Sequence, residues 1–372
     1  MSINRRTLLN VSAAALALQA LPQSAVATPT DPDASVARLL SRVAERLLTD
    51  YPEGATSAGV DTGARARLRA KLGDRSGAGQ HAIAQHVRET LRQLQRIDAA
   101  TLTPAHRVDL DVVRTVHELA AEGFAFPFGD CAILNSNWSY RNSPYVVAQN
   151  VGAFVEIPSF LDSSHPIHTR DDAEAYLERL EAYARQLDGE TERLREDATR
   201  GVTLPDFLAE KCVSQLRRGR GQPLEQWGVV TSLTRRSASL SGDYGARSVR
   251  IARERIAPAL DRQIAVLEAG RAHAISDAGV WRLPQGEAYY AWALRAGTTT
   301  TMTPDDVHAM GLDELRSLQS RMDPILRSLG YTEGSVGARM TALGNDPRYQ
   351  FASGDEGREQ ILAFVRDRVT DI

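Results

Sequence analysis

Apolar residues recur at helical spacing along almost the whole chain, whereas alternation of apolar and polar residues is nearly absent. Residues spaced by three, four and seven positions fall on one face of an α-helix, so each such run predicts a helix with one buried face. We therefore predict an all-α fold, organised as one large helical domain over residues 28–372. The runs with this spacing are 36–47, 87–97, 112–119, 176–187, 256–267 and 307–322.

Start signals precede several of these runs. Thr303 is followed by Pro304, which is the order of an N-cap residue and a proline at the first helical position, and Thr103 is also followed by a proline. Thr169 stands three residues before Asp172, a spacing typical of reciprocal capping. These positions predict where three of the helices begin.

One segment, residues 124–160, lacks the helical spacing of apolar residues and is instead rich in aromatic residues and prolines. We predict an irregular loop and a short helix, packed against the helical core. A cleft wall is the functional alternative, and plain packing is the favoured interpretation. The residues concerned are Phe124, Phe126, Phe128, Trp138, Tyr140, Tyr145 and Phe154, with Pro127, Pro144 and Pro158 among them.

The N-terminus has the order of an export signal. Arg5 and Arg6 precede an uncharged apolar stretch at 11–21, which resembles the twin-arginine motif. The stretch is shorter than the ~20 residues that cross a membrane. Small residues before Thr28 predict cleavage there. Residues 1–27 are thus predicted to be a twin-arginine signal peptide and the mature protein to be periplasmic or secreted, with an ordinary Sec signal or a lipid-free anchor as alternatives.

Composition excludes some partners. The formal net charge of −3 gives no reason to expect nucleic acid, and no other stretch is apolar enough to span a membrane. Lys71 and Lys211 are the only lysines, and we interpret the excess of arginine as genome composition. Cys131 and Cys212 could pair in an oxidising compartment or stay separately buried, and the sequence leaves both open.

The search for a chemical site finds no complete motif. A zinc peptidase places His-Glu-x-x-His on one helix face, yet the only His-Glu pair, at His117, has Ala121 where the second histidine would stand. A Gly-x-Ser-x-Gly elbow, a phosphate loop and a dinucleotide fingerprint are also missing from the sequence. We predict no metal site and no catalytic residue. The remaining close histidine pairs, which a proline or a five-residue spacing keeps off one face, are His165 with His168 and His81 with His86.

A longer series of motifs is more specific than any of these single motifs. Residues 283–314 show Leu-Pro-x-Gly, tyrosine, a threonine run, Thr-Pro with acidic residues, and His-x-x-Gly-Leu. Residues 145–180 show Tyr, Gly, Ile-Pro, Phe-Leu and His-Pro-Ile, and Asp-Pro-Arg-Tyr follows at 346–349. In this order the motifs resemble the bacterial domain-of-unknown-function family 885 (DUF885) over most of residues 35–372.

The resemblance implies a fold and a site. Members of that family look like helical zinc metallopeptidases of the gluzincin type, with His-Glu-x-x-His downstream of the Asp-Pro-Arg-Tyr region. This chain ends at Ile372 before that point, so the resemblance covers the N-terminal part, with zinc expected only in full-length relatives and peptides as the implied partners. For His308, packing at the start of its helix is the favoured alternative. The candidate substrate-binding residues are Tyr289, Tyr290, Thr298, Thr299, Thr300 and His308.

Three functional hypotheses follow. The first is a truncated, catalytically inactive relative of zinc peptidases, and the second is a non-enzymatic periplasmic binding or interaction module. An intact hydrolase is least favoured because no nucleophile and base are paired. Residues 360–369 lack a helix stop signal, which favours truncation. Truncation also predicts that some apolar residues lack a packing partner, namely Leu315, Leu318, Met322, Ile361 and Phe364. The oligomeric state is left open.

Overall fold

The computed structural model describes residues 31–133, 141–272 and 274–371, and these residues form helices and no β-strand. Two isolated bridges, Asp130 with Ser143 and Ala148 with Val151, are their only β-type pairings. The predicted all-α class is therefore confirmed. The predicted signal peptide and its cleavage site lie outside the described residues, as do Trp138 and Tyr140.

The described residues cluster into two compact units, 31–299 and 300–371, where the sequence had predicted a single domain over 28–372. We call them the N-terminal unit and the C-terminal unit. The N-terminal unit contains α2 (Pro32–Asp50), α3 (Pro52–Ser57), α4 (Gly77–Leu94), α5 (Pro104–Gly123), α6 (Ala153–Ser163), α7 (Arg170–Thr199), α8 (Asp206–Arg220), α9 (Gly228–Arg236), α10 (Tyr244–Ile251), the π-helical turn η4 (Ala252–Ile256), α11 (Ala257–Arg271) and α12 (Gly286–Thr298). The C-terminal unit contains α13 (Pro304–Ser328), α14 (Val336–Gly344) and α15 (Asp355–Thr370). Short 3-10 turns lie at η1 (Gly63–Ala70), η2 (Ala99–Thr101), η3 (Leu224–Gln226), η5 (Val280–Arg282) and η6 (Pro347–Tyr349).

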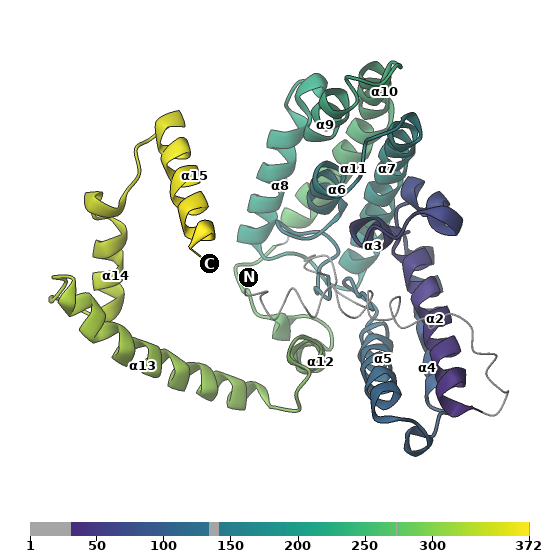
Figure 1. Ribbon diagram of the computed structural model, residues 1–372, viewed down its shortest axis with the longest axis horizontal. Coiled ribbons are helices and arrows are strands. Elements are labelled where there is room, and N and C mark those ends of the chain that lie inside the picture. The colour runs from purple at the N-terminus through teal and green to yellow at the C-terminus, as the bar shows by residue number, and fades with distance from the viewer. Residues whose placement is uncertain (1–30, 134–140, 273, 372) are drawn as a thin grey trace. The chain divides into compact units, whose positions relative to one another are not determined.

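The longest helix, α7, lies at the centre of the N-terminal unit. The predicted capping box is present, because Thr169 and Asp172 each bind the other's backbone N–H. In Figure 1, α6, α10 and α11 lie against α7, and α8 lies against α11. Tyr176, Leu180 and Leu187 on this helix are completely buried, as the helical spacing predicted. Each such burial stabilises the fold by about 1.5–3 kcal/mol.

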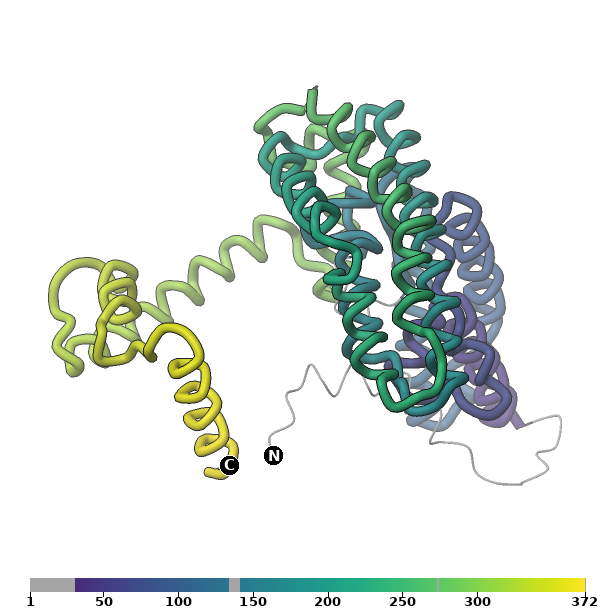
Figure 2. The backbone as a smooth tube through the Cα atoms, turned by 90° about the horizontal axis from the view of Figure 1, so that it is seen from above, coloured from purple at the N-terminus to yellow at the C-terminus, as the bar shows by residue number. Residues whose placement is uncertain are grey.

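A second core joins α2, α4 and α5, which Figure 2 shows in purple and blue beside the rest of the unit. The apolar stripe predicted on α5 is partly wrong, because Val112 is 49% exposed. The buried face of α5 instead carries Leu110, His117 and Ala120. Val112 is two positions from Leu110, or about 200° around the helix, so the two cannot share a face. Thr103 begins this helix without a side-chain capping bond.

The aromatic segment packs as predicted. Residues 124–133 and 141–152 are irregular and are followed by α6. The rings of Phe126 and Phe128 contact Tyr289 and Trp292 of α12, with ring centroids 5.2–5.7 Å apart. At the end of the segment Gly152 has φ +117°, a conformation that favours glycine. This turn directs the N–H of Ala153 at the carboxylate of Glu190.

The C-terminal unit begins with the predicted cap. Thr303 and Asp306 form a capping box with Pro304 at the first helical position of α13. The apolar side chains of this unit, however, are mostly exposed: Leu315 is 51%, Ile361 44% and Phe364 49% exposed. Leu315, Leu318 and Ile361 are therefore exposed as predicted, whereas Met322 is partly buried and the ring of Phe364 lies 5.9 Å from that of Phe351.

Candidate functional site

The six residues predicted to bind substrate are divided between the two units. Tyr289 on α12 is 4% exposed, and its hydroxyl donates to the carbonyl oxygen of Asn142 at 2.9 Å. Its ring forms a cluster with Phe126, Phe128 and Trp292. Tyr289 therefore holds the irregular segment against α12, and its side chain is committed to packing.

Its neighbour Tyr290 points the other way and is half exposed. Thr298 and Thr299 end the same helix, and both are exposed. The Thr298 hydroxyl donates to the carbonyl of Leu294, and Thr299 has φ 54°, the left-handed conformation that commonly terminates a helix. These residues form the C-terminal end of α12, and substrate binding by them stays a prediction.

The other two candidates belong to the C-terminal unit. Thr300 is exposed and precedes α13, whose second turn begins with His308, also exposed. Packing of His308 on its own turn, the favoured alternative, stays an interpretation. Binding of a substrate by His308 also stays a prediction.

The histidines considered as metal ligands lie either in the core or on the surface. His117 is 2% exposed, and its Nδ1 lies 2.7 Å from the carbonyl oxygen of Val113, which fixes the proton on Nδ1. Burial lowers the pKa of His117 below its usual value, so the ring stays neutral. His168 and His81 are exposed. In the described part of the chain, no group of three or more His, Cys, Asp or Glu side chains could hold a metal ion.

His165 is fixed by two partners and cannot turn towards a ligand. Its Nε2 donates to the carbonyl of Asp172 at 2.9 Å, and its Nδ1 accepts from Nη1 of Arg179 at 2.8 Å. An arginine only donates and a carbonyl only accepts, so the tautomer follows from the partners. Burial lowers the pKa of His165 to about 4, which keeps the ring neutral. The histidine is a structural acceptor for a buried arginine.

A buried ion-pair network was not predicted from the sequence. Arg75 pairs with Glu156 at 2.5 Å and with Glu190 at 2.9 Å, which joins the loop before α4 to α6 and α7. Nearby, Arg141 and Arg193 both pair with Asp130. Burial alone raises the pKa of Asp130, but the two guanidinium groups outweigh it and hold the pKa well below its usual range. The network therefore ties the irregular segment to the central helix.

Asp197, at the end of α7, has only a long ion pair, with its carboxylate 3.9 Å from Nη1 of Arg200. Its carboxylate accepts from the backbone N–H of Gly129 at 3.1 Å, and burial raises its pKa to about 6. The folded pKa lies above the unfolded value of about 3.9, so this contribution to stability is complete below about pH 4 and is lost as the pH rises through 6.

Asp197→Asn is therefore expected to flatten the fall in stability between pH 4 and pH 7. The amide oxygen keeps the acceptor for Gly129, and the variant should be more stable than the parent at pH 7.5 by about 1–3 kcal/mol. Urea unfolding at pH 4.5 and 7.5 measures this. Glu192→Gln, at an exposed position on the same helix, is the control, with a change within about 0.5 kcal/mol. An unchanged pH dependence in Asp197→Asn would contradict the assignment.

Both cysteines are free thiols in the interior. Cys131 lies in the irregular segment and Cys212 on α8, and they are not joined. Burial raises the pKa of each thiol to about 12. Since the thiolate is the nucleophile and the metal ligand, neither residue is suited to either role at neutral pH.

A comparison with protein families matches residues 52–372 to the family described as bacterial protein of unknown function (DUF885). The chain belongs to this family. The match begins within α3 and runs through both units, which include the Leu-Pro-x-Gly and Asp-Pro-Arg-Tyr motifs. The resemblance inferred from those motifs is confirmed.

One solved structure has the same fold. It is the crystal structure of a candidate lipoprotein from Colwellia psychrerythraea, 21% identical, with a TM-score of 0.79. The match covers 91% of this chain and 59% of that chain, so this DUF885 chain spans about three fifths of its length. Among curated proteins, none matches. No helix among the described residues is long and apolar enough to cross a membrane.

Proposed function

We propose that this chain is an exported DUF885 protein that forms a non-catalytic helical portion of a zinc-peptidase-like fold, without peptidase activity of its own. The observation that carries the proposal is the lack of a metal-binding set in the described residues. Catalytic zinc takes three protein ligands, and a single imidazole cannot replace them. The only His-Glu pair places His117 in the core, bound to a backbone carbonyl.

The exposed apolar residues of the C-terminal unit favour this proposal over its alternative. A self-contained binding or interaction module is expected to bury its own apolar faces, as most monomeric proteins do. In this unit, Leu315, Leu318 and Phe364 are 40–51% exposed. Such faces are expected in a portion of a larger fold.

The proposal predicts that purified residues 28–372, dialysed after exposure to ZnCl₂, retain much less than one zinc ion per chain and cleave no peptide. Elemental analysis of the protein and a fluorogenic peptide library measure the two outcomes. A zinc-binding protein carried through the same dialysis is the control for metal loss. About one tightly held zinc ion per chain, together with chelator-sensitive peptide cleavage, would overturn the proposal.

The export route is tested separately. Changing both Arg5 and Arg6 to lysine is expected to leave the protein in the cytoplasm, because the proposed route requires the pair of guanidinium groups. Cell fractionation measures this, and the exposed Arg42→Lys on α2 is the matched control. Normal export of the double variant would exclude the twin-arginine route but leave a Sec signal open.

A further inference from the structure

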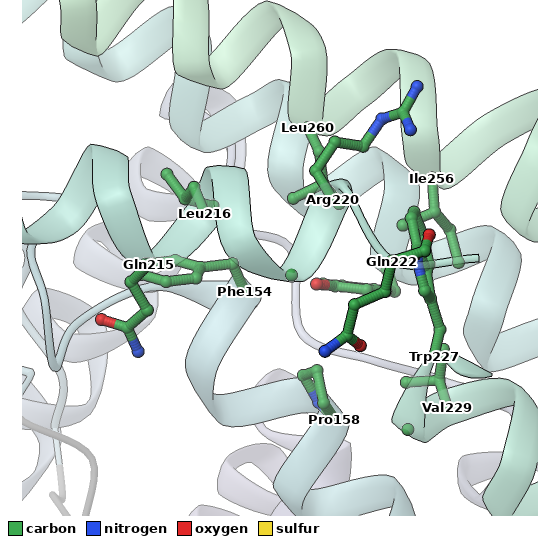
Figure 3. A pocket seen from close by; sticks show the side chains of 13 residues that line it. Phe154, Pro158, Gln215, Leu216, Arg220, Gln222, Trp227, Val229, Ile256 and Leu260 are labelled. Carbon is green, nitrogen blue, oxygen red and sulfur yellow. The ribbon is translucent and has the colours of Figure 1, made fainter. Parts of the chain in front are cut away.

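A cavity of about 240 Å³ lies within the N-terminal unit, among α6, α7, α8, α9 and α11. Figure 3 shows labelled side chains from α6, α8, α9, η4 and α11 grouped around it. Its walls are apolar and partly aromatic, and they include Phe154, Pro158, Leu216, Trp227, Ile256 and Leu260. All of them belong to one compact unit, so the cavity is a property of that unit alone.

The backbone beside the cavity is irregular at one point. Between α10 and α11 the chain passes through a π-helical turn, Ala252–Ile256, and Ile256 at its end is a wall residue. Single π-helical turns inside α-helices are rare and are found frequently at functional sites. The π-helical turn therefore makes this part of the core a candidate for a functional site.

A tyrosine hydroxyl at the cavity has no hydrogen-bond partner among the described residues. Tyr183 on α7 is 3% exposed and lines the cavity, yet its hydroxyl makes no hydrogen bond to any described residue. Seven residues, or about two turns, earlier on the same helix, Tyr176 donates to the carbonyl of Val229 at 2.9 Å. The hydroxyl oxygen of Tyr183 is not among the fully enclosed side-chain atoms that lack a partner, so it is open to the cavity. The hydroxyl of Tyr183 is thus available to a ligand.

The polar groups at the cavity carry no unpaired charge. The guanidinium of Arg220 is held by two hydrogen bonds to the carboxylate of Asp261, at 2.9 and 3.0 Å. The remaining polar side chains are the amides of Gln215 and Gln222, and no carboxylate lines the cavity. A charged ligand would therefore lose water to apolar walls and find no unpaired counter-ion there, which is unfavourable. These walls suit a neutral ligand.

We propose that this cavity binds a neutral aromatic group of one or two rings, with a polar atom hydrogen-bonded to the hydroxyl of Tyr183. An apolar cavity of about 150 Å³ accepts benzene, so this larger volume has room for a bicyclic ring such as indole. The rings of Phe154 and Trp227 offer the edge and face contacts that aromatic groups prefer. The same chemistry is found in a free aromatic metabolite and in an aromatic side chain of a peptide.

Two helical glycines provide a matched test. Gly219 is the next-to-last residue of α8 and lines the cavity, and Gly270 is the next-to-last residue of α11 and does not. A Cβ added at either position meets no atom within 4 Å. Gly219→Leu should therefore fill the cavity, whereas Gly270→Leu makes the same chemical change elsewhere. Both changes raise helix propensity, so both variants should fold.

The probe is 5-fluoroindole, titrated into purified residues 28–372 and followed by ¹⁹F NMR. We expect one saturable site in the parent protein and in Gly270→Leu, and at least about tenfold weaker binding in Gly219→Leu. Tyr183→Phe keeps the ring and loses the hydroxyl, and it should weaken binding about three- to tenfold. Thermal unfolding of each variant checks that it is folded.

Three results would overturn the proposal: no saturation in the parent up to about 5 mM probe, equal affinities in the two glycine variants, or an unchanged affinity in Tyr183→Phe. Competition identifies the source of the ring. If N-acetyltryptophanamide displaces the probe as well as indole does, the site takes a peptide side chain. If only indole displaces it, the site takes a free small molecule. Peptidase activity plays no part in this readout.

Discussion

Replacing Arg179 with alanine is expected to lower the free energy of unfolding by about 3–5 kcal/mol, enough to leave much of the protein unfolded at 37 °C. The side chain is completely buried. Its guanidinium donates to the carbonyls of Lys71 and Leu68 and to the hydroxyl of Thr56, besides His165. Each acceptor left without a donor in the interior costs about 1–3 kcal/mol.

The buried guanidinium of Arg179 is unusual because no carboxylate is among its hydrogen-bond partners in the described chain. Burial lowers the pKa of Arg179 to about 10, and the ring of Phe160 lies 4.8 Å from its guanidinium carbon. Arg179→Lys keeps the charge but not the planar fork that reaches four acceptors, so it should recover only part of the stability.

Chemical denaturation of the parent and the variants measures the effect. Arg185→Ala is the control, because Arg185 is exposed and lies on the same helix. Its effect should stay within about 0.5 kcal/mol. If Arg179→Ala were as mild as the control, the hydrogen bonds of the buried guanidinium could not be what joins α7 to the segment around η1.

The helices themselves could be predicted because their signals are local. The capping residues Thr169 and Thr303 and the stripe ending at Leu267 depend only on nearby sequence, and the structure has them where expected. The family resemblance came from motif order and was also correct. In contrast, the stripe predicted on α5 was partly wrong, because Val112 is exposed whereas its neighbour Val113 packs against the core beside Leu110.

The buried polar network could not be predicted, because its partners are far apart in sequence. Arg75 and Glu190 are separated by 115 residues, and Arg193 and Asp130 by 63. On α7, the polar residues at 179, 186, 190 and 193 share one face, which sequence analysis reads as a solvent-facing face. One signal of this burial was present in the sequence. The helix is long and has apolar residues on its other faces, which is typical of a central helix surrounded by other helices.

In the candidate substrate site, a shift of one residue along α12 decides whether a tyrosine is buried or exposed. Tyr289 and Tyr290 are adjacent, so they point to different sides of α12. Only the first lies at the three-residue spacing from Trp292 that places both rings in the core. The motif marked both tyrosines alike, and the distinction between packing and exposure needed the three-dimensional partner, Phe126.

The last prediction concerns the apolar face of α13. Leu315, Leu318, Met322 and Ile325 follow one another at spacings of three and four, so they form a continuous stripe on one side of the helix. Leu315 is 51% and Ile325 59% exposed. Soluble monomers rarely expose apolar patches beyond a few hundred Å². Purified residues 28–372 are therefore expected to bind a hydrophobic dye in the native state and to self-associate.

Changing Leu315 and Leu318 together to glutamine should reduce the dye fluorescence severalfold and favour the monomer, as seen by light scattering. Both side chains are exposed, so the melting temperature should change little, and Ser317→Gln on the same helix is the control that removes no apolar surface. A different outcome, a cooperative protein that binds no dye and whose double variant behaves like the control, would mean that the stripe is covered. It would then favour the self-contained binding module over a portion of a larger fold.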